Sequence, residues 1–190
     1  MNIEAILTNP RLIVILAKID SRLSDQVKEG RCPYCGGPLH QADYDRNPRS
    51  PLALGWKHKR RRSLCCGSTG CRRRTKPPSV IFLGSHVYLS ILVILVTAMC
   101  HGVSARRARI LTQEFEIDRS TLARWRRWWL EEFAETSFWK ARRHRFFKQL
   151  RLGMKPLRAL MAFFVEHPQG RGVIPLLKFM APLTSSSAAV

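Results

Sequence analysis

The chain has 190 residues, a hydrophobic share of 45% and a formal net charge of +20 at pH 7. This length predicts one or two small domains, and this hydrophobic share excludes a chain that is disordered throughout. A charge of this size predicts a polyanionic partner, which means DNA, RNA or an anionic membrane. The charge is also unevenly placed, because residues 46–113 contain fourteen Lys and Arg and no Asp or Glu.

The cysteine content indicates the compartment. The chain has six cysteines, and it begins without the basic segment and long apolar core of a secretory signal. Both features predict a reducing compartment. In such a compartment cysteines serve more often as metal ligands or buried thiols than in disulfides.

Residues 1–30 are predicted to hold an amphipathic helix. Pro10 is typical of a first helical turn, Gly30 is typical of a residue beyond the last turn, and apolar residues recur at helical spacing from Leu12 to Val27. A helix of this kind packs against the rest of its domain or against a second copy of the chain. We assign it no chemistry.

Residues 31–79 are predicted to form a small zinc ribbon built on short β hairpins. A CxxC motif is followed by two glycines, and a second cysteine pair surrounds a glycine-rich turn about thirty residues later. Glycines at these places allow the positive φ that lets backbone amides point at sulfur. Four thiolates in two such turns predict a closed, tetrahedral Zn²⁺ site with a structural role. The predicted ligands are Cys32, Cys35, Cys66 and Cys71.

The second cysteine pair leaves alternatives open. Cys65 and Cys66 are adjacent, and either closes a loop with Cys71. We prefer Cys66, because Cys65 would then be an inward apolar residue of a strand. His40 and His58 are alternative ligands, although a loop histidine is the more ordinary interpretation. The competing interpretation of the whole group is a set of buried free thiols.

Two basic runs flank the predicted metal site, one on each side of the second cysteine pair. No acidic residue is close to them in the sequence, so we expect both to contact nucleic-acid phosphates. A merely solvated basic loop is the competing interpretation. Residues 77–79 follow and are predicted to form a stiff joint to the next unit. The arginines assigned to DNA contact here are Arg60, Arg61, Arg62, Arg72, Arg73 and Arg74.

Residues 80–135 are predicted to form a helix-turn-helix DNA-binding unit. Residues 87–100 are apolar, and an unbroken run of 14 residues is more typical of a core helix than of a membrane span. Basic residues on both sides of this run also argue against a membrane orientation. Ser104 is a good N-cap for a second helix, which carries Arg106, and Ser120 or Asp118 begins a third helix.

The third helix has two different faces. At 100° per residue, Leu122, Trp125, Trp129 and Phe133 fall on one side, which predicts the core seam. Polar and basic residues fall on the other side, where a recognition helix meets base edges. Arginine can bond guanine through two hydrogen bonds, and threonine can contact the methyl group of thymine. The residues assigned to DNA contact are Ser120, Thr121, Arg124 and Arg127, together with Arg106 on the second helix.

A cysteine-knuckle ribbon followed by helices that read GVSARRAR (102–109) and STLARWRRWW (120–129) resembles the DNA-binding region of bacterial insertion-sequence transposases. It is also similar to short accessory regulators that some such elements encode beside the catalytic protein. The resemblance covers residues 31–135. It implies Zn²⁺ as cofactor, double-stranded DNA and a separately encoded transposase as partners, and a bacterial cytoplasmic location at the nucleoid. The chain departs from a complete transposase, because it is short and has no set of three widely spaced carboxylates for strand cleavage.

Residues 136–190 are predicted to form basic and apolar helices with a disordered tail. Basic and aromatic residues alternate up to about residue 148, as in an amphipathic helix or a further phosphate contact. Two short apolar helices, over residues 154–166 and 173–180, are candidates for a homodimer interface, because paired DNA sites favour dimers. The tail is expected to fray from Thr184 onward.

The expected fold is therefore mainly α, with a small zinc ribbon, a helix-turn-helix bundle and C-terminal helices in that order. The expected function is zinc-dependent, sequence-specific DNA binding for a mobile element, as a transposase accessory or regulator. One alternative is an RNA-binding zinc-ribbon protein, and another is a membrane-associated protein with a basic cytosolic domain. An enzyme is the last choice, because no catalytic residue set can be recognised in the sequence.

Overall fold

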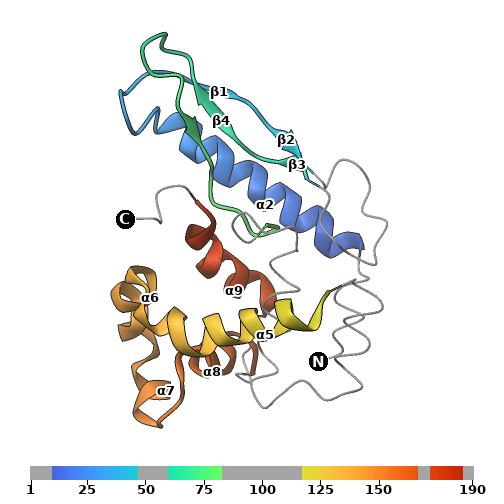
Figure 1. Cartoon of the computed structure of the whole chain (residues 1–190), viewed down its shortest axis with the longest axis vertical. Coiled ribbons are helices and arrows are strands. Elements are labelled where there is room, and N and C mark those ends of the chain that lie inside the picture. Colours follow the sequence, from blue (N-terminus) through green and yellow to red (C-terminus); the bar gives the residue numbers. More distant parts are fainter. Residues whose placement is uncertain (1–9, 47–59, 83–116, 167–171, 186–190) are drawn as a thin grey trace.

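The structure is a computed structural model that describes residues 10–46, 60–82, 117–166 and 172–185 (Figure 1). Within these ranges the chain is mainly helical with a few short antiparallel strands, as the sequence predicts. The apolar run 87–100, the second predicted helix with Arg106, and His58 lie outside the described residues. The helix-turn-helix as a whole therefore stays a prediction.

The first described helix, α2 (Pro10–Glu29), has the bounds that Pro10 and Gly30 predict. One side of α2 is buried at spacings of three and four residues, which is the pattern of an amphipathic helix. Figure 1 shows α2 lying along the short strands of the ribbon. The buried side is apolar in its first half and polar in its second half. Its buried residues are Ile13, Leu16, Asp20 and Ser24.

Two small antiparallel sheets lie in residues 31–46 and 60–79, and this part of the chain is called the ribbon below. β4 (Leu64–Cys66) pairs with β1 (Leu39–Gln41) on one side and with β5 (Arg74–Thr75) on the other. β2 (Tyr44–Asp45) pairs with β3 (Arg60–Arg61). The ribbon's own core is small, so a bound metal would supply much of its folding energy. The buried residues of this core are Cys32, Leu39, Leu64 and Cys66.

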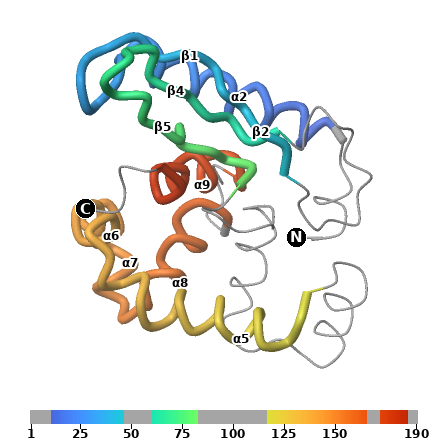
Figure 2. Tube along the Cα trace, turned by 45° about the horizontal axis from the view of Figure 1, so that its top comes forward, coloured from blue at the N-terminus to red at the C-terminus, as the bar shows by residue number. Residues whose placement is uncertain are grey.

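The C-terminal half is a succession of short helical segments. In chain order they are α5 (Arg119–Arg127), the π-helical turn η2 (Trp128–Glu132), the 3-10 turn η3 (Phe133–Glu135), α6 (Ser137–Arg142), the 3-10 turn η4 (Arg143–Phe146), α7 (Phe147–Arg151), α8 (Pro156–Met161), the π-helical turn η5 (Ala162–Glu166), α9 (Val173–Met180) and the 3-10 turn η6 (Ala181–Thr184). The two short apolar helices predicted after residue 153 are thus confirmed. Figure 2 shows α2 and the strands on one side of the molecule, α5 on the other, and α9 between them.

Aromatic side chains fill the core of this helical part. The ring centroids of Trp129 and Phe133 lie 4.9 Å apart, and Trp139 stacks on Phe146 at 5.3 Å. One continuous core cluster includes these rings, residues 80–82 and the apolar part of α2, so α2 packs on both the ribbon and the helices. The predicted core seam of the third helix is confirmed, because all of its members are buried. They are Leu122, Trp125, Trp129 and Phe133.

A buried polar junction joins α2, the end of the ribbon and the C-terminal turn. The Asp20 carboxylate accepts hydrogen bonds from the Ser79 hydroxyl at 2.5 Å and from the Val80 N–H at 2.6 Å. The Ser79 N–H donates to the Thr184 hydroxyl at 2.7 Å. The Thr184 hydroxyl in turn donates to the Ala181 carbonyl at 2.7 Å. These polar groups satisfy one another where water has no access.

Arg61 completes the junction from the ribbon side. It is 2% exposed, and its guanidinium donates to the carbonyl oxygens of Pro77 at 2.7 Å and Thr184 at 3.2 Å. Thr184, which was predicted to begin a frayed tail, is instead buried. Residues 77–79, predicted as a stiff joint between units, are held inside the junction. The partners of these residues lie up to 123 positions away in the sequence, so local patterns do not indicate them.

Burial raises the pKa of Asp20 from 3.8 to about 6, although hydrogen bonds from Ser79 and Val80 and the positive charge of Arg61 favour the carboxylate. The unfolded chain therefore releases this proton at a lower pH than the folded chain does. Between about pH 4 and pH 6 a rise in pH favours the unfolded state. The contribution of Asp20 to stability is greatest below this window and is lost as the pH rises through it.

We expect Asp20→Asn to remove this part of the pH dependence of stability. The free energy of unfolding of the wild type, relative to that of the variant, should fall by up to about 3 kcal/mol from pH 4 to pH 7, because one pKa unit corresponds to about 1.4 kcal/mol. Urea unfolding followed by circular dichroism at several pH values measures the free energy of unfolding of the wild type and of the variant. Ser24→Ala, which alters a buried polar residue of the same helix that does not titrate, is the control. Parallel pH profiles for the wild type and Asp20→Asn would contradict the expectation.

Candidate metal centre

The first cysteine turn follows directly from the end of α2. The Cys32 N–H donates to the Gly37 carbonyl at 3.0 Å, and the Gly36 N–H donates to the Cys32 carbonyl at 2.8 Å. Gly36 has a φ of 71°, the left-handed conformation that its place in the motif predicts. Gly37 is needed for a different reason. A Cβ atom at Gly37 would collide with the Ser68 hydroxyl and lie 3.2 Å from the Cys66 sulfur.

The second cysteine turn has a related geometry but no glycine at the corresponding position. The N–H groups of Cys71 and Arg72 both donate to the Ser68 carbonyl, at 3.0 and 3.2 Å. Arg72 follows the second cysteine as Gly36 does in the first turn, and its φ is 49°. A left-handed backbone costs a residue with a Cβ roughly 1–2 kcal/mol. The expectation that the glycines of this turn supply the positive φ is wrong, and Arg72 adopts it instead.

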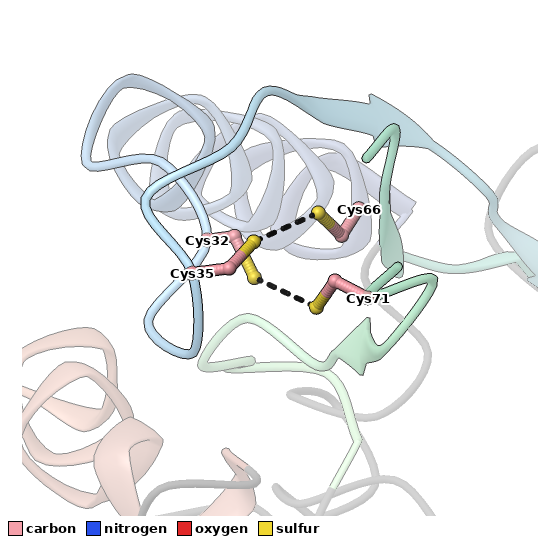
Figure 3. A group of neighbouring side chains, drawn as sticks. All are labelled: Cys32, Cys35, Cys66 and Cys71. Atoms are coloured by element: carbon pink, nitrogen blue, oxygen red, sulfur yellow. Dashed lines mark hydrogen bonds between the residues drawn. The ribbon is translucent and has the colours of Figure 1, made fainter. Parts of the chain in front are cut away.

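The four predicted ligands form one cluster (Figure 3). The sulfur atoms of Cys32, Cys35, Cys66 and Cys71 all lie within 4.8 Å of one another. The Cys32 and Cys71 sulfurs are 3.8 Å apart, and the Cys35 and Cys66 sulfurs are 3.5 Å apart. In a tetrahedral site with Zn–S bonds of about 2.3 Å, neighbouring sulfurs lie about 3.8 Å apart. The cluster therefore has the dimensions of a metal site with four thiolate ligands.

The surroundings of the sulfurs favour the thiolate form of Cys66 over that of Cys71. A hydrogen bond from the Ser68 N–H lowers the pKa of Cys66 to about 7, against the effect of its burial. At Cys71 the Arg73 N–H also favours the thiolate. Burial and the neighbouring thiols outweigh that bond and raise the pKa of Cys71 to about 11. A bound Zn²⁺ would reduce this conflict, because it attracts each thiolate and offsets two of the four negative charges.

The preference for Cys66 over Cys65 is confirmed, but the reason differs from the one predicted. Along β4 the side chains alternate, so Leu64 and Cys66 are buried while Cys65 is half-buried on the opposite side of the strand. The Cys65 sulfur lies 3.5 Å from the Arg72 carbonyl and takes no part in the cluster. His40, the other alternative ligand in the described part of the chain, is exposed in β1.

The three arginines of the basic run at β3 differ in how accessible they are. Arg61 is buried in the junction. The Arg62 guanidinium lies 2.7 Å from the Asp43 carboxylate, whose side chain is 1% exposed. The exposed Arg60 lies 3.6 Å from Asp45, its partner across the β2–β3 pair. The absence of acids near Arg60–Arg62 in the sequence was misleading, because antiparallel pairing brings acids from residues 43–45 beside them.

Asp43 holds the bend between β1 and β2. Its carboxylate accepts hydrogen bonds from the Gln41 amide at 2.6 Å, the Arg62 guanidinium at 2.7 Å and the Ser63 N–H at 3.0 Å. Burial alone would raise the pKa of Asp43, but these bonds and the charge of Arg62 outweigh it and lower the pKa. No local pattern in the sequence indicates the role of this carboxylate, because its partners lie up to 20 residues away.

The second basic run follows Cys71 of the cysteine cluster and is exposed. Arg73 lies over the ring of Tyr34 at 4.7 Å, and Arg74 lies 6.0 Å from the ring of Tyr44. Among the described residues no carboxylate pairs with Arg72, Arg73 or Arg74. The two tyrosines were not among the residues predicted to belong to a site. The sequence feature that indicates Tyr34 is its place inside the CxxC motif. In the structure its side chain is 51% exposed.

The third predicted helix is present as α5, and three of its four predicted DNA-contacting residues are exposed. These are Ser120, Arg124 and Arg127. Thr121 is 9% exposed, and its hydroxyl accepts a hydrogen bond of 3.5 Å from Arg124. It is less accessible than the other three residues, and its assignment as a base reader stays a prediction. Asp118 caps the helix by accepting a bond from the Ser120 N–H at 2.7 Å. Hydrogen bonds from the Ser120 hydroxyl and N–H lower the pKa of Asp118.

No family model matches the chain, and neither a curated protein nor a solved structure matches it. The likeness to insertion-sequence transposases stays a prediction from the sequence. None of the described helices has the length and apolar character of a membrane span. The apolar run 87–100 lies outside the described residues.

The cysteine cluster makes a direct prediction about metal content. Purified protein should carry one Zn²⁺ per chain, and Cys66→Ser should lower this content at least tenfold, because serine removes a thiolate ligand. Elemental analysis after gel filtration measures it. Cys65→Ser is the matched control and should keep the metal. Equal metal content in the two variants, or none in the wild type, would contradict the assignment.

Proposed function

We propose that this chain is a zinc-dependent, sequence-specific DNA-binding protein that acts by binding rather than by catalysis. The four thiolates would hold one structural Zn²⁺. The observation that carries the proposal is the exposed run Arg72, Arg73 and Arg74, which starts at the last cysteine of the cluster and has no carboxylate partner among the described residues. Phosphate oxygens are the ligands that such a run fits.

The backbone of Arg72 supports this proposal. Glycine would adopt its φ of 49° without steric cost, as Gly36 does in the first turn. Strained backbone of this kind persists where the surrounding structure determines it, and it is concentrated at functional sites. A metal bound to Cys71 would fix the turn, and the turn would direct the arginine outward. Metal binding and polyanion binding would then depend on the same few residues.

The exposed face of α5 would supply sequence recognition. Arg124 and Arg127 are exposed on a helix whose other face is fixed in the aromatic core through Trp125. A helix held in this way can lie in a major groove and present guanidinium groups to base edges. The ribbon would contact phosphates, which position the protein on the duplex without reading its sequence.

The setting that we propose is a bacterial mobile element. The chain would bind the ends of the element or a promoter, as a homodimer where sites are paired, and act with a separately encoded transposase or as a repressor. The support for this setting is the resemblance in residues 31–135.

Arg72→Gly should separate folding from DNA binding. Glycine relieves the left-handed strain, so the variant should be as stable as the wild type or up to about 1 kcal/mol more stable. The slope of log affinity against log salt for duplex DNA should become less steep by about 0.9, the value for one phosphate contact. Chemical unfolding and fluorescence anisotropy measure the two quantities.

The control for Arg72→Gly is Arg22→Gln, which removes an exposed charge from α2. It should leave the salt slope unchanged. Equal salt slopes for Arg72→Gly and the wild type would show that Arg72 does not contact a phosphate. Tighter binding of a structured RNA than of any duplex would favour the RNA-binding alternative.

Arg124→Ala should cost about 1–3 kcal/mol of binding free energy on the preferred site and relax the specificity at one base position. Arg126→Ala, an exposed neighbour about 200° around the same helix, should weaken binding equally on all sequences or not at all. The preferred site is first obtained by selection from a random duplex library. The same loss from Arg124→Ala on every sequence would exclude α5 as the reading element.

A further inference from the structure

Two adjacent aromatic residues at the end of η4 lie in opposite environments. Phe146 is completely buried and packs against Trp139, whereas Phe147 is 61% exposed. Leu152 follows at 75%, and these two are the most exposed large hydrophobic residues in the described part of the chain. The core holds the backbone here through Phe146, so Phe147 is presented outward by a fixed element.

The segment around Phe147 is strongly basic. Residues 136–165 contain eight Lys and Arg and no Asp or Glu. Arg143, Arg145, Lys148 and Lys155 are exposed, and none of them has a carboxylate partner among the described residues. The segment that comprises η4, α7 and the following turn, residues 143–155, is called the basic turn below. Its charge is complementary to that of a polyanion.

The position of Arg151 distinguishes between possible polyanions. Its guanidinium carbon lies over one face of the Phe147 ring, 5.6 Å from the ring centroid. If the ring entered a lipid bilayer, this charged group would be drawn from water with it, at a high desolvation cost. If a nucleic-acid base stacked on the other face of the ring, Arg151 would stay at the surface, close to the phosphates. The pair therefore suits a nucleic acid better than a membrane.

An intact duplex would not use the ring. Its bases are stacked on one another, and phosphate contacts need only the cationic side chains. An unpaired base has a free face, and every base can stack on an aromatic ring. We propose that the basic turn binds an unpaired stretch of nucleic acid, with one base stacked on Phe147 and phosphates bound by Arg145 and Lys148. This inference rests on the proposed function and specifies its substrate as DNA that is locally unpaired, such as a distorted site.

The test compares Phe147→Leu with the wild type, using labelled oligothymidylate and a mixed-sequence duplex of equal length as probes. Loss of base stacking should weaken binding of oligothymidylate roughly 5- to 150-fold, while binding of the duplex stays unchanged. Phe147→Trp is the matched control and should retain the affinity, because indole also stacks. Since Phe147 is exposed, both variants are expected to fold, which circular dichroism confirms.

A charge variant tests the phosphate contacts separately. Lys148→Gln should make the salt slope for oligothymidylate less steep by about 0.7, the value for one phosphate contact on a single strand. Equal oligothymidylate affinity for Phe147→Leu and the wild type would overturn the stacking, and so would no binding of oligothymidylate by the wild type. Binding to phosphatidylserine vesicles that survives in Phe147→Leu, with no binding of oligothymidylate, would assign the basic turn to membranes. If the wild type bound no duplex DNA, the proposed function would be contradicted whatever the result for oligothymidylate.

Discussion

The buried junction between Asp20, Ser79, Thr184 and Arg61 is the interaction on which the arrangement of the whole chain depends. It joins α2, the segment that follows β5 and the last helical turn, through hydrogen bonds that span up to 123 positions in the sequence. Removal of one partner would leave a buried polar group or charge unsatisfied, which is strongly destabilising. The ribbon and the helices therefore have a fixed relative orientation, although the ribbon has its own small core.

The junction and the cysteine cluster together restrain the segment from Arg61 to Ser79. Hydrogen bonds of the junction hold Arg61 and Ser79 at the two ends of this segment. Cys66 and Cys71, in its middle, belong to the cysteine cluster. The exposed arginines that follow Cys71 lie between these two points of attachment. Ordering of a flexible basic loop on a polyanion has an entropic cost, and restraint in advance reduces it. The structure thus explains how a ribbon with so small a core can present a defined basic surface.

Local patterns predicted the local features of this chain. Pro10 and Gly30 predicted the first helix, the cysteine spacing predicted all four members of the cluster, and helical periodicity predicted which side of α5 is buried. The burial and partners of Arg60, Arg61 and Arg62 could not be predicted in the same way. One of these residues is buried and two are paired, because their partners come from residues 43–45, 77 and 184. Pairing of distant segments decides the role of each residue in such a run, and composition does not contain that information.

Arg72 shows where a departure from a local rule is informative. The two cysteine turns have related hydrogen bonds, and the first uses glycine for the left-handed residue while the second uses arginine. Natural sequences agree with local backbone preferences at most positions, and the exceptions concentrate at functional or strained sites. The core of the ribbon gives no reason for the exception, since Arg72 is exposed and contributes nothing to packing there. The phosphate contact proposed for the guanidinium would account for it, and such a contact would distinguish the second turn from the first.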